Sequence, residues 1–171
     1  KTTASGDGVA AKLREQGDVL ARAAGRTAVH GPAVRVSLND SPLRGDQIPK
    51  GMTVDDIVVH QQDVQGVVNA LWRGGAEAMT LMDQRVISTS AVRCVGNTLI
   101  LQGRVYSPPF VITAIGDPAT LRQALDTDPT VSTYRQYVAA VGLGYDVLSI
   151  PDVTFPAYEG SVAMSYARRA S

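Results

Sequence analysis

Apolar residues between positions 63 and 75 recur with the period of an α-helix. Residues spaced i, i+3, i+4, i+7 and i+8 fall on one side of a helix, which is the side that packs against a core. In this stretch they are Val64, Val67, Val68, Leu71 and Trp72. Asp63 provides an N-cap, and Gly74 with Gly75 provides a left-handed end, so the pattern predicts a helix with one buried face.

Other stretches are typical of β-strands, because apolar and polar residues alternate in them or, at residues 110–115, because they form a short apolar run. They cover residues 34–38, 76–82, a segment from about residue 85, and residues 98–106, 110–115 and 145–155. Within residues 98–106, Leu99, Leu101 and Val105 are expected to share one face. Pro151 cannot donate a backbone hydrogen bond, so the last strand is expected to lie at a sheet edge or to contain a bulge.

Two further helices are predicted after residue 116. Asp117 and Asp128 are each an N-cap followed by a proline at the first helical position, and Gly142 ends the second helix. This order of elements predicts an α+β fold, specifically a ferredoxin-like βαββαβ arrangement with an inserted β-hairpin and an N-terminal helix. A three-layer α/β fold is the alternative, although it requires more helix than the pattern contains.

The N-terminal part of the chain predicts a separate helix over residues 9–24. Val9, Leu13, Leu20 and Ala24 lie on one side of it. This helix either packs on the domain or forms the end of a membrane-proximal coiled coil, in which a partner helix contacts Leu13 and Leu20. Because Gly31 and Pro32 are expected to break the chain, residues 1–30 form an N-terminal arm and helix, and residues 31–171 form a single α+β globular domain.

Composition is consistent with one globular domain and an arm. The chain has 171 residues, of which 44% are hydrophobic and 19% are charged. Sixteen basic residues balance 16 acidic ones, so nothing in the charge favours a nucleic-acid partner. No apolar run in this sequence approaches the ~20 residues that a membrane-spanning helix needs.

The residues that carry most enzyme chemistry are scarce. Cys94 is the only cysteine, and a Cys94–His60 pair is one conceivable nucleophile and base. Cys94 lies in an alternating apolar run, which favours a buried structural role, and His60 precedes a helix, which favours capping. The chain contains none of the usual metal-ligand or phosphate-binding spacings. We therefore predict no catalytic residues, no metal site and no cofactor.

Several longer motifs resemble one bacterial family. The segments are VVNALWRGGAEAMTLMDQRV, SAVRCVGNTLILQGR and PPFVITAIGDPATL, followed by FPAYEG and SYARR. Together, from Val34 to Arg169, they are similar to the YlxW-like proteins, also called domain of unknown function 881. The resemblance implies a single-pass protein of the cell membrane with an extracytoplasmic domain, attached to the membrane through a segment upstream of this chain. Some members are linked to cell division or sporulation in Gram-positive bacteria, and the family supplies no catalytic residues that could be assigned here.

The leading functional hypothesis is that this chain is a non-catalytic, extracytoplasmic protein-interaction or assembly domain. It is expected to bind protein partners or to associate with a second copy of itself. Its candidate interaction surfaces are Leu13 and Leu20 on the N-terminal helix, and Val153 and Phe155 on the last strand, where an exposed edge can pair with another chain.

Two other classes remain open from the sequence. The first is a small-ligand-binding module at a dimer interface, with Arg93, Asn97 and Arg104 lining the pocket; the ligand itself is unknown. The second is a hydrolase or thiol enzyme that uses Cys94 or His60.

Overall fold

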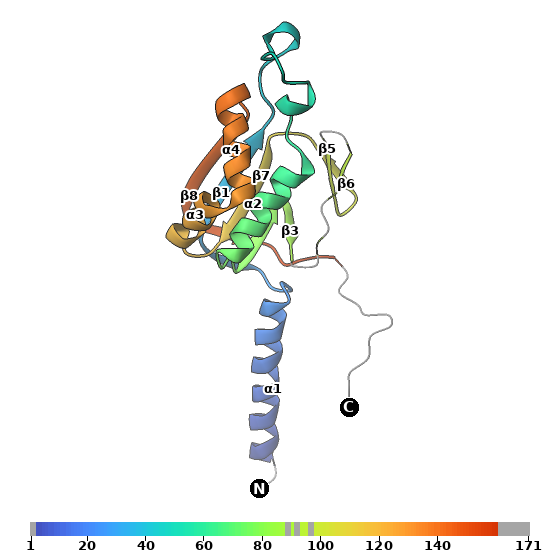
Figure 1. Ribbon diagram of the computed structural model, residues 1–171. Helices are drawn as coiled ribbons and strands as arrows, with labels where there is room; N and C mark the ends of the chain where they lie inside the picture. Colours follow the sequence, from blue (N-terminus) through green and yellow to red (C-terminus); the bar gives the residue numbers. More distant parts are fainter. Residues whose placement is uncertain (1–2, 88–89, 91–92, 96–97, 161–171) are drawn as a thin grey trace, which may run out of the picture.

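Five antiparallel strands form the main sheet of the protein (Figure 1). The computed structural model describes residues 3–87, 90, 93–95 and 98–160. The strand order is β3-β2-β7-β1-β8. The strands are β1 (Val29–Asn39), β2 (Ala78–Leu81), β3 (Gln84–Val86), β7 (Phe110–Ile115) and β8 (Gly144–Phe155). Because strands and helices are mixed around an antiparallel sheet, the predicted α+β class is confirmed.

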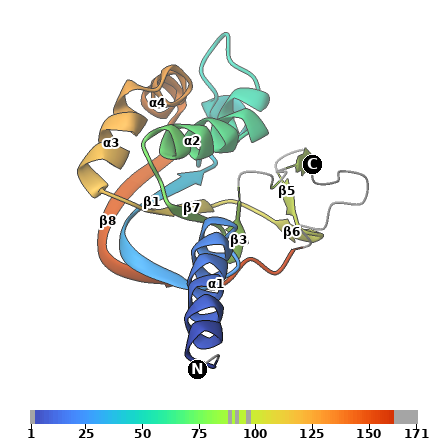
Figure 2. The same ribbon diagram turned by 90° about the horizontal axis from the view of Figure 1, so that it is seen from below.

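Three helices cover one face of this sheet (Figure 2). They are α2 (Gln61–Arg73), α3 (Pro118–Thr127) and α4 (Pro129–Val141). The caps predicted at Asp117 and Asp128 are present, because Asp117 accepts a hydrogen bond from the backbone of Thr120 and Asp128 accepts from Thr130 and Val131. The cap predicted at Asp63 is wrong, because α2 begins earlier: His60 is its N-cap and Asp63 is the third residue of the helix. Since these three helices share one face, the three-layer alternative is wrong for the described part of the chain.

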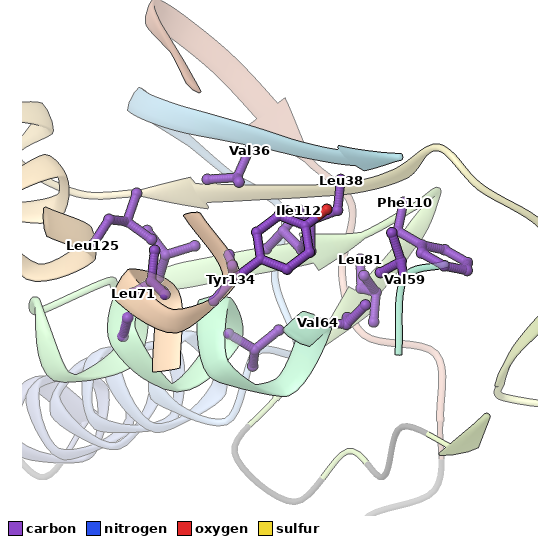
Figure 3. Close-up of a cluster of buried hydrophobic side chains, with 14 of the residues drawn as sticks. Val36, Leu38, Val59, Val64, Leu71, Leu81, Phe110, Ile112, Leu125 and Tyr134 are labelled. Atoms are coloured by element: carbon purple, nitrogen blue, oxygen red, sulfur yellow. The ribbon is translucent and has the colours of Figure 1, made fainter. Parts of the chain in front are cut away.

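The hydrophobic core lies between the sheet and these helices (Figure 3). Val36 on β1 pairs in register with Ile112 on β7, and both side chains are fully buried. They face Leu71 of α2, Leu125 of α3 and Tyr134 of α4, which are also buried. The helix period of α2 and the alternation of the strands therefore meet in one core, as the sequence pattern predicts.

Helix α1 (Thr3–Ala23) stands away from the globular part (Figure 1). It begins earlier than the predicted helix at residue 9, and Gly25 with a φ of 72° follows its end. Nearly all of its described side chains are exposed. The alternative in which this helix packs on the domain is therefore wrong.

A second, three-stranded sheet is inserted between β3 and β7. Its strands are β4 (Arg93–Val95), β5 (Thr98–Leu101) and β6 (Arg104–Tyr106). The insertion is therefore larger than the predicted hairpin. Residues 98–106 were expected to form one strand, but Gln102 (φ 50°) and Gly103 (φ 80°) reverse the chain. As a result, Val105 is 65% exposed and does not share the buried face of Leu99 and Leu101.

Strand β1 continues through Gly31 and Pro32, where the sequence predicted a break. The register with β8 shifts here, because Gly31 pairs with Val153 whereas Ala33 pairs with Ile150. One extra residue of β8 is accommodated at Pro151, so the predicted edge position and irregularity are both present.

The connection from β1 to α2 contains two short 3₁₀ helices, η1 (Gly45–Gln47) and η2 (Asp55–Ile57). Ser41, at the start of this connection, is buried and contacts the end of α4. Its hydroxyl donates a hydrogen bond to the carbonyl of Val141.

Candidate functional site

Several large apolar side chains are exposed on α1. Val9 is 57% exposed, Leu13 is 62% exposed and Leu20 is 69% exposed. Val19, next to Leu20, is 51% exposed. Large apolar side chains in a helix normally face a partner, because helices in water gain most of their stability from packing such a face. The structure thus leaves Leu13 and Leu20 accessible, while their role in binding stays a prediction.

The predicted surface on the last strand is only partly accessible. Phe155 is 3% exposed, and its ring packs with Ala33, Ala78 and Ile115 in a small second core. Val153 is half-buried against the same cluster. By strand alternation this cluster lies on the sheet face opposite the helices. Phe155 is therefore buried rather than exposed at a sheet edge, and its role in binding stays a prediction.

Arg104, one of the three predicted ligand-binding residues, is engaged within the chain. Its guanidinium lies 2.5 Å from a carboxylate oxygen of Asp83 and 5.7 Å from the ring centre of Tyr106. The Tyr106 hydroxyl also donates to Asp83, and this hydrogen bond is the main reason that the pKa of Asp83 lies below its ordinary value. Arg104 and Tyr106 thus hold the turn between β2 and β3.

The other two predicted ligand-binding residues are not brought together with it by any described contact. Arg93 lies in β4, where its backbone pairs with Ile100. Asn97 lies outside the described residues. Arg104 instead lines a cavity of about 190 Å³ together with Arg85 of β3.

Sequence reasoning missed Arg85. This residue is 5% exposed, and burial lowers the pKa of its guanidinium. The only signal in the sequence is a single arginine next to Val86 in a short strand, and alternation alone does not tell which sheet face becomes covered.

His60 has the predicted capping role at the start of α2. Its backbone N–H donates to the Asp63 carboxylate at 2.8 Å, in the reciprocal arrangement of a capping box. His60 Nε2 lies 3.1 Å from Asp55, whose side chain is 85% exposed. Burial raises the pKa of Asp63, and the hydrogen bond from His60 opposes that rise.

A cavity of about 320 Å³ lies beside this histidine, with Asp55, Asp56, Tyr134 and Tyr137 among its lining residues. Within the part of the chain that the structure describes, no three histidine, cysteine, aspartate or glutamate side chains are grouped as a metal ion requires. Cys94 is a residue of β4 opposite Leu99, and the conceivable Cys94–His60 pair stays a hypothesis.

The described residues form an α+β domain whose core lies between a sheet and three helices. An exposed helix, α1, precedes this domain, and the buried Arg85 lies beside a small cavity. The chain belongs to the family described as bacterial protein of unknown function (DUF881), whose model matches residues 3–168. The family that the sequence motifs indicated is thereby confirmed.

Proteins of two bacteria are similar in sequence to part of this chain. The UPF0749 protein YlxW of Bacillus subtilis is 34% identical over 102 residues, covering 60% of this chain and 42% of that protein. The UPF0749 protein Rv1823 of Mycobacterium tuberculosis is 29% identical over 133 residues, covering 76% of this chain and 43% of that protein. This chain therefore spans less than half the length of the curated relatives that it matches.

A solved structure also matches. The crystal structure of an uncharacterized conserved protein from Mycobacterium tuberculosis is 26% identical, with a TM-score of 0.65 over 88% of this chain and 96% of that one. Among the described residues of the present chain, no helix has the length and hydropathy that crossing a membrane requires.

Proposed function

We propose that this chain is a non-catalytic assembly domain that associates with a second copy of itself through α1, as the extracytoplasmic part of a membrane-anchored bacterial protein. The observation that carries the proposal is the exposure of Leu13 and Leu20 on a helix that the domain leaves uncovered. The proposal extends to a role in cell-envelope processes such as division, which the resemblance implies for some members of the family, although the family's own description assigns no function.

The finer fold assignment belongs to the same proposal. With β3 set aside, the order β2-β7-β1-β8 corresponds to a ferredoxin-like sheet. Strand β1 and strand β2 are parallel with β7 between them, and β7 and β8 are parallel with β1 between them. This arrangement supports the assignment of α2, and of α3 with α4, to the two crossover connections.

Helix α1 is poorly suited to standing alone in water. It has 21 residues, and Gly6, Gly8 and Gly17 lie within it. Each glycine lowers helix stability by about 1 kcal/mol relative to alanine. A helix of this composition is marginal unless its apolar side is packed against another surface. Since the globular part does not cover it, a partner has to supply that surface.

The spacing of the apolar residues favours a second copy of α1 as that partner. Val9, Leu13, Gln16, Leu20 and Ala23 are separated alternately by four and three residues. That alternation is the seam of a two-stranded coiled coil, in which identical helices pair side by side. The seam covers only two heptads and includes Gln16, so association is expected to be weak in the isolated domain and stronger in the full-length protein.

Disulfide trapping in the full-length protein tests this pairing. In a Cys94→Ser background, single cysteines replace Leu13 or Leu20, and cells are treated with a mild oxidant before non-reducing electrophoresis. In a parallel coiled coil these seam positions face their counterparts, so each variant is expected to form a covalent homodimer.

Asp18→Cys is the matched control, because position 18 lies on the opposite side of the same helix. We expect little dimer from this variant. Equal trapping at positions 13, 18 and 20, or none at 13 and 20, contradicts the proposal. Trapping only between a Leu13→Cys chain and a Leu20→Cys chain contradicts the parallel orientation.

The same control variant tests the location. A maleimide that cannot cross membranes is expected to label Asp18→Cys in intact cells as fully as in lysed cells. Labelling that requires lysis contradicts an extracytoplasmic domain.

A further inference from the structure

The direction in which α1 leaves the globular part is set at a short connection. Helix α1 ends at Ala23 and β1 begins at Val29, so residues 24–28 join the two. A connection that contains glycine bends readily unless other contacts hold it. Because α1 stands away from the sheet and its helices (Figure 1), any such contacts have to lie at this connection.

The first set of contacts closes the end of α1. Gly25, with a φ of 72°, donates a backbone hydrogen bond to the carbonyl of Arg22 at 2.9 Å. The backbone N–H of Arg26 donates to the carbonyl of Ala21 at 2.7 Å. These two bonds form a Schellman motif, which fixes the path of the chain relative to the helix as far as Arg26.

A second segment lies against this helix end. Strand β8 ends at Phe155, which is opposite Val29 of β1. Residues 156–160 follow, and we call them the strap. The backbone N–H of Tyr158 in the strap donates to the carbonyl of Gly25 at 2.7 Å. This bond continues the pairing of β1 and β8 beyond the strands, so the strap contacts the residue that closes α1.

The side chain of Arg26 holds the same segment a second time. Its Nη1 donates to the carbonyl of Gly160 at 3.0 Å and to the carbonyl of Tyr158 at 3.4 Å. A guanidinium presents its donors in a rigid plane, so binding two carbonyls of one segment restrains the position of that segment. The strap is therefore bonded to the end of α1 through both backbone and side chain.

The other end of the strap is attached to the sheet. Arg85 of β3 is 5% exposed, and its Nη1 donates to the carbonyl of Pro156 at 3.0 Å. Its guanidinium carbon lies 6.0 Å from the ring centre of Phe155. The connection also packs on the residue that follows β3, since a Cβ at Gly25 would lie 2.8 Å from Cγ2 of Ile87. The strap thus bridges the sheet and the end of α1.

We propose that the strap fixes the direction of α1 relative to the globular domain, so that helix and domain move as one body. The buried Arg85 and the exposed Arg26 are the positioning residues at its two ends. The device acts within one chain and does not require a partner. Its consequence for a dimer rests on the function proposed above: two domains joined through α1 would be held at a fixed angle to each other.

A distance measurement within one chain tests this proposal on the intact protein. In a Cys94→Ser background, nitroxide labels are attached to Asp18→Cys on α1 and Ser132→Cys on α4, which are both exposed positions. Labelled protein is diluted into an excess of unlabelled protein, so that pulsed electron paramagnetic resonance reports distances within a chain. One narrow distance distribution is expected. A broad distribution overturns the proposal.

Two variants release the strap from α1. Arg26→Ala removes the side-chain contacts, and Tyr158→Pro also removes the N–H that binds Gly25. In the double variant the distance distribution is expected to become at least about twice as broad, because the connection then behaves as a flexible linker. Arg26→Ala alone is expected to broaden it without shifting the urea midpoint of the globular part, because Arg26 is exposed.

Arg22→Ala is the matched control, because Arg22 is an exposed arginine in the last turn of α1. This variant is expected to keep the narrow distribution of the parent protein. A distribution that stays narrow in the folded double variant overturns the proposal, and so does equal broadening by Arg22→Ala and Arg26→Ala.

A further variant separates the strap from the pairing of α1. Leu13→Gln combined with Leu20→Gln removes the apolar side chains but keeps good helix formers, and it leaves the strap contacts intact. The distribution is expected to stay narrow. Broadening in this variant shows that pairing directs α1, which overturns the strap proposal. A narrow distribution in a protein whose α1 gives no disulfide-trapped dimer supports the strap and contradicts only the proposed self-association.

Discussion

Asp128 binds Arg73 of α2 with one carboxylate oxygen while its other oxygen caps α4. Oδ1 accepts hydrogen bonds from the backbones of Thr130 and Val131 at 2.8 and 3.0 Å, and Oδ2 accepts from Arg73 Nη2. Asp128 is 4% exposed, whereas the side chain of Arg73 is 63% exposed. One buried carboxylate therefore joins α2 to the junction between α3 and α4.

Removing this carboxylate is expected to destabilise the fold through the cap more than through the ion pair. Asp128→Ala is expected to lower the free energy of unfolding by about 1–2 kcal/mol, the usual effect of losing an N-cap. Arg73→Ala is expected to cost less than about 1 kcal/mol, because its charge is largely in water. Urea denaturation at neutral pH measures both values. A larger loss for Arg73→Ala than for Asp128→Ala contradicts this ranking.

The pH dependence of stability is expected to change in alkaline solution because of Tyr134. Its buried hydroxyl donates to the carbonyl of Gly144 at 2.8 Å, and burial raises its pKa far above the ordinary value. The unfolded chain releases this proton near pH 10, while the folded chain retains it. The contribution of Tyr134 is thus fully present below about pH 10 and is lost as the pH rises above it.

Tyr134→Phe tests this coupling. Between about pH 10 and pH 11.5 the wild-type free energy of unfolding is expected to fall more steeply than that of the variant, by up to about 1.4 kcal/mol per pH unit for one proton. At neutral pH the variant is expected to be about 1 kcal/mol less stable, because the Gly144 carbonyl loses its donor. Burial also raises the pKa of Tyr145, which is unchanged in this variant and leaves some alkaline slope. Identical slopes in the two proteins contradict the assignment to Tyr134.

Much of the fold could be predicted because its signals are local. The caps at Asp117 and Asp128 depend on two adjacent residues, and the buried side of α2 depends on a spacing of three and four. The turn at Gln102 was missed for a local reason too. A positive φ is uncommon in a glutamine, and Leu99, Leu101 and Val105 keep the spacing of one strand face across the turn.

The candidate site could not be predicted to the same degree, because it depends on contacts between distant segments. Arg85 is buried by Phe155 and Pro156, about 70 residues further along the chain. Strand alternation assigns Arg85 to a face, but only the curvature of β1 and β8 determines that the face is covered. The apolar side of α1 was visible in the sequence, yet the same pattern is consistent with packing on the domain, which the structure excludes.

The inserted sheet contacts the main core through the buried side chains of β5, and these side chains are expected to stabilise the fold. Leu101 is fully buried within the main core, whereas Val105 on β6 is 65% exposed. Leu101→Ala is expected to lower the free energy of unfolding by about 2–5 kcal/mol, because it removes buried methyl groups and leaves a cavity. Val105→Ala is expected to change it by less than about 0.5 kcal/mol. Similar losses in the two variants contradict the reversal at residues 102 and 103 and support the single strand instead.

Two glycines in helices are expected to respond to alanine in opposite directions. In α1, a Cβ at Gly17 contacts nothing within 4 Å, so Gly17→Ala adds helix propensity without a clash. In α2, a Cβ at Gly66 lies 2.6 Å from Cγ2 and 3.0 Å from Cβ of Thr130, near the start of α4. Thr130 is branched at Cβ and its backbone is held by Asp128, so it cannot turn away freely.

Gly17→Ala is therefore expected to stabilise α1 by about 0.5–1 kcal/mol and to increase the helical circular dichroism signal, with no loss in the unfolding of the globular part. If α1 pairs with a second copy, the same variant is also expected to associate more tightly in sedimentation experiments, because less conformational entropy is lost when the helix forms. Gly66→Ala is expected to destabilise the domain by about 1–3 kcal/mol, because α2 and α4 are forced apart. A Gly66→Ala protein as stable as wild type contradicts the close approach of these two helices, and a Gly17→Ala protein that loses helix contradicts a continuous α1.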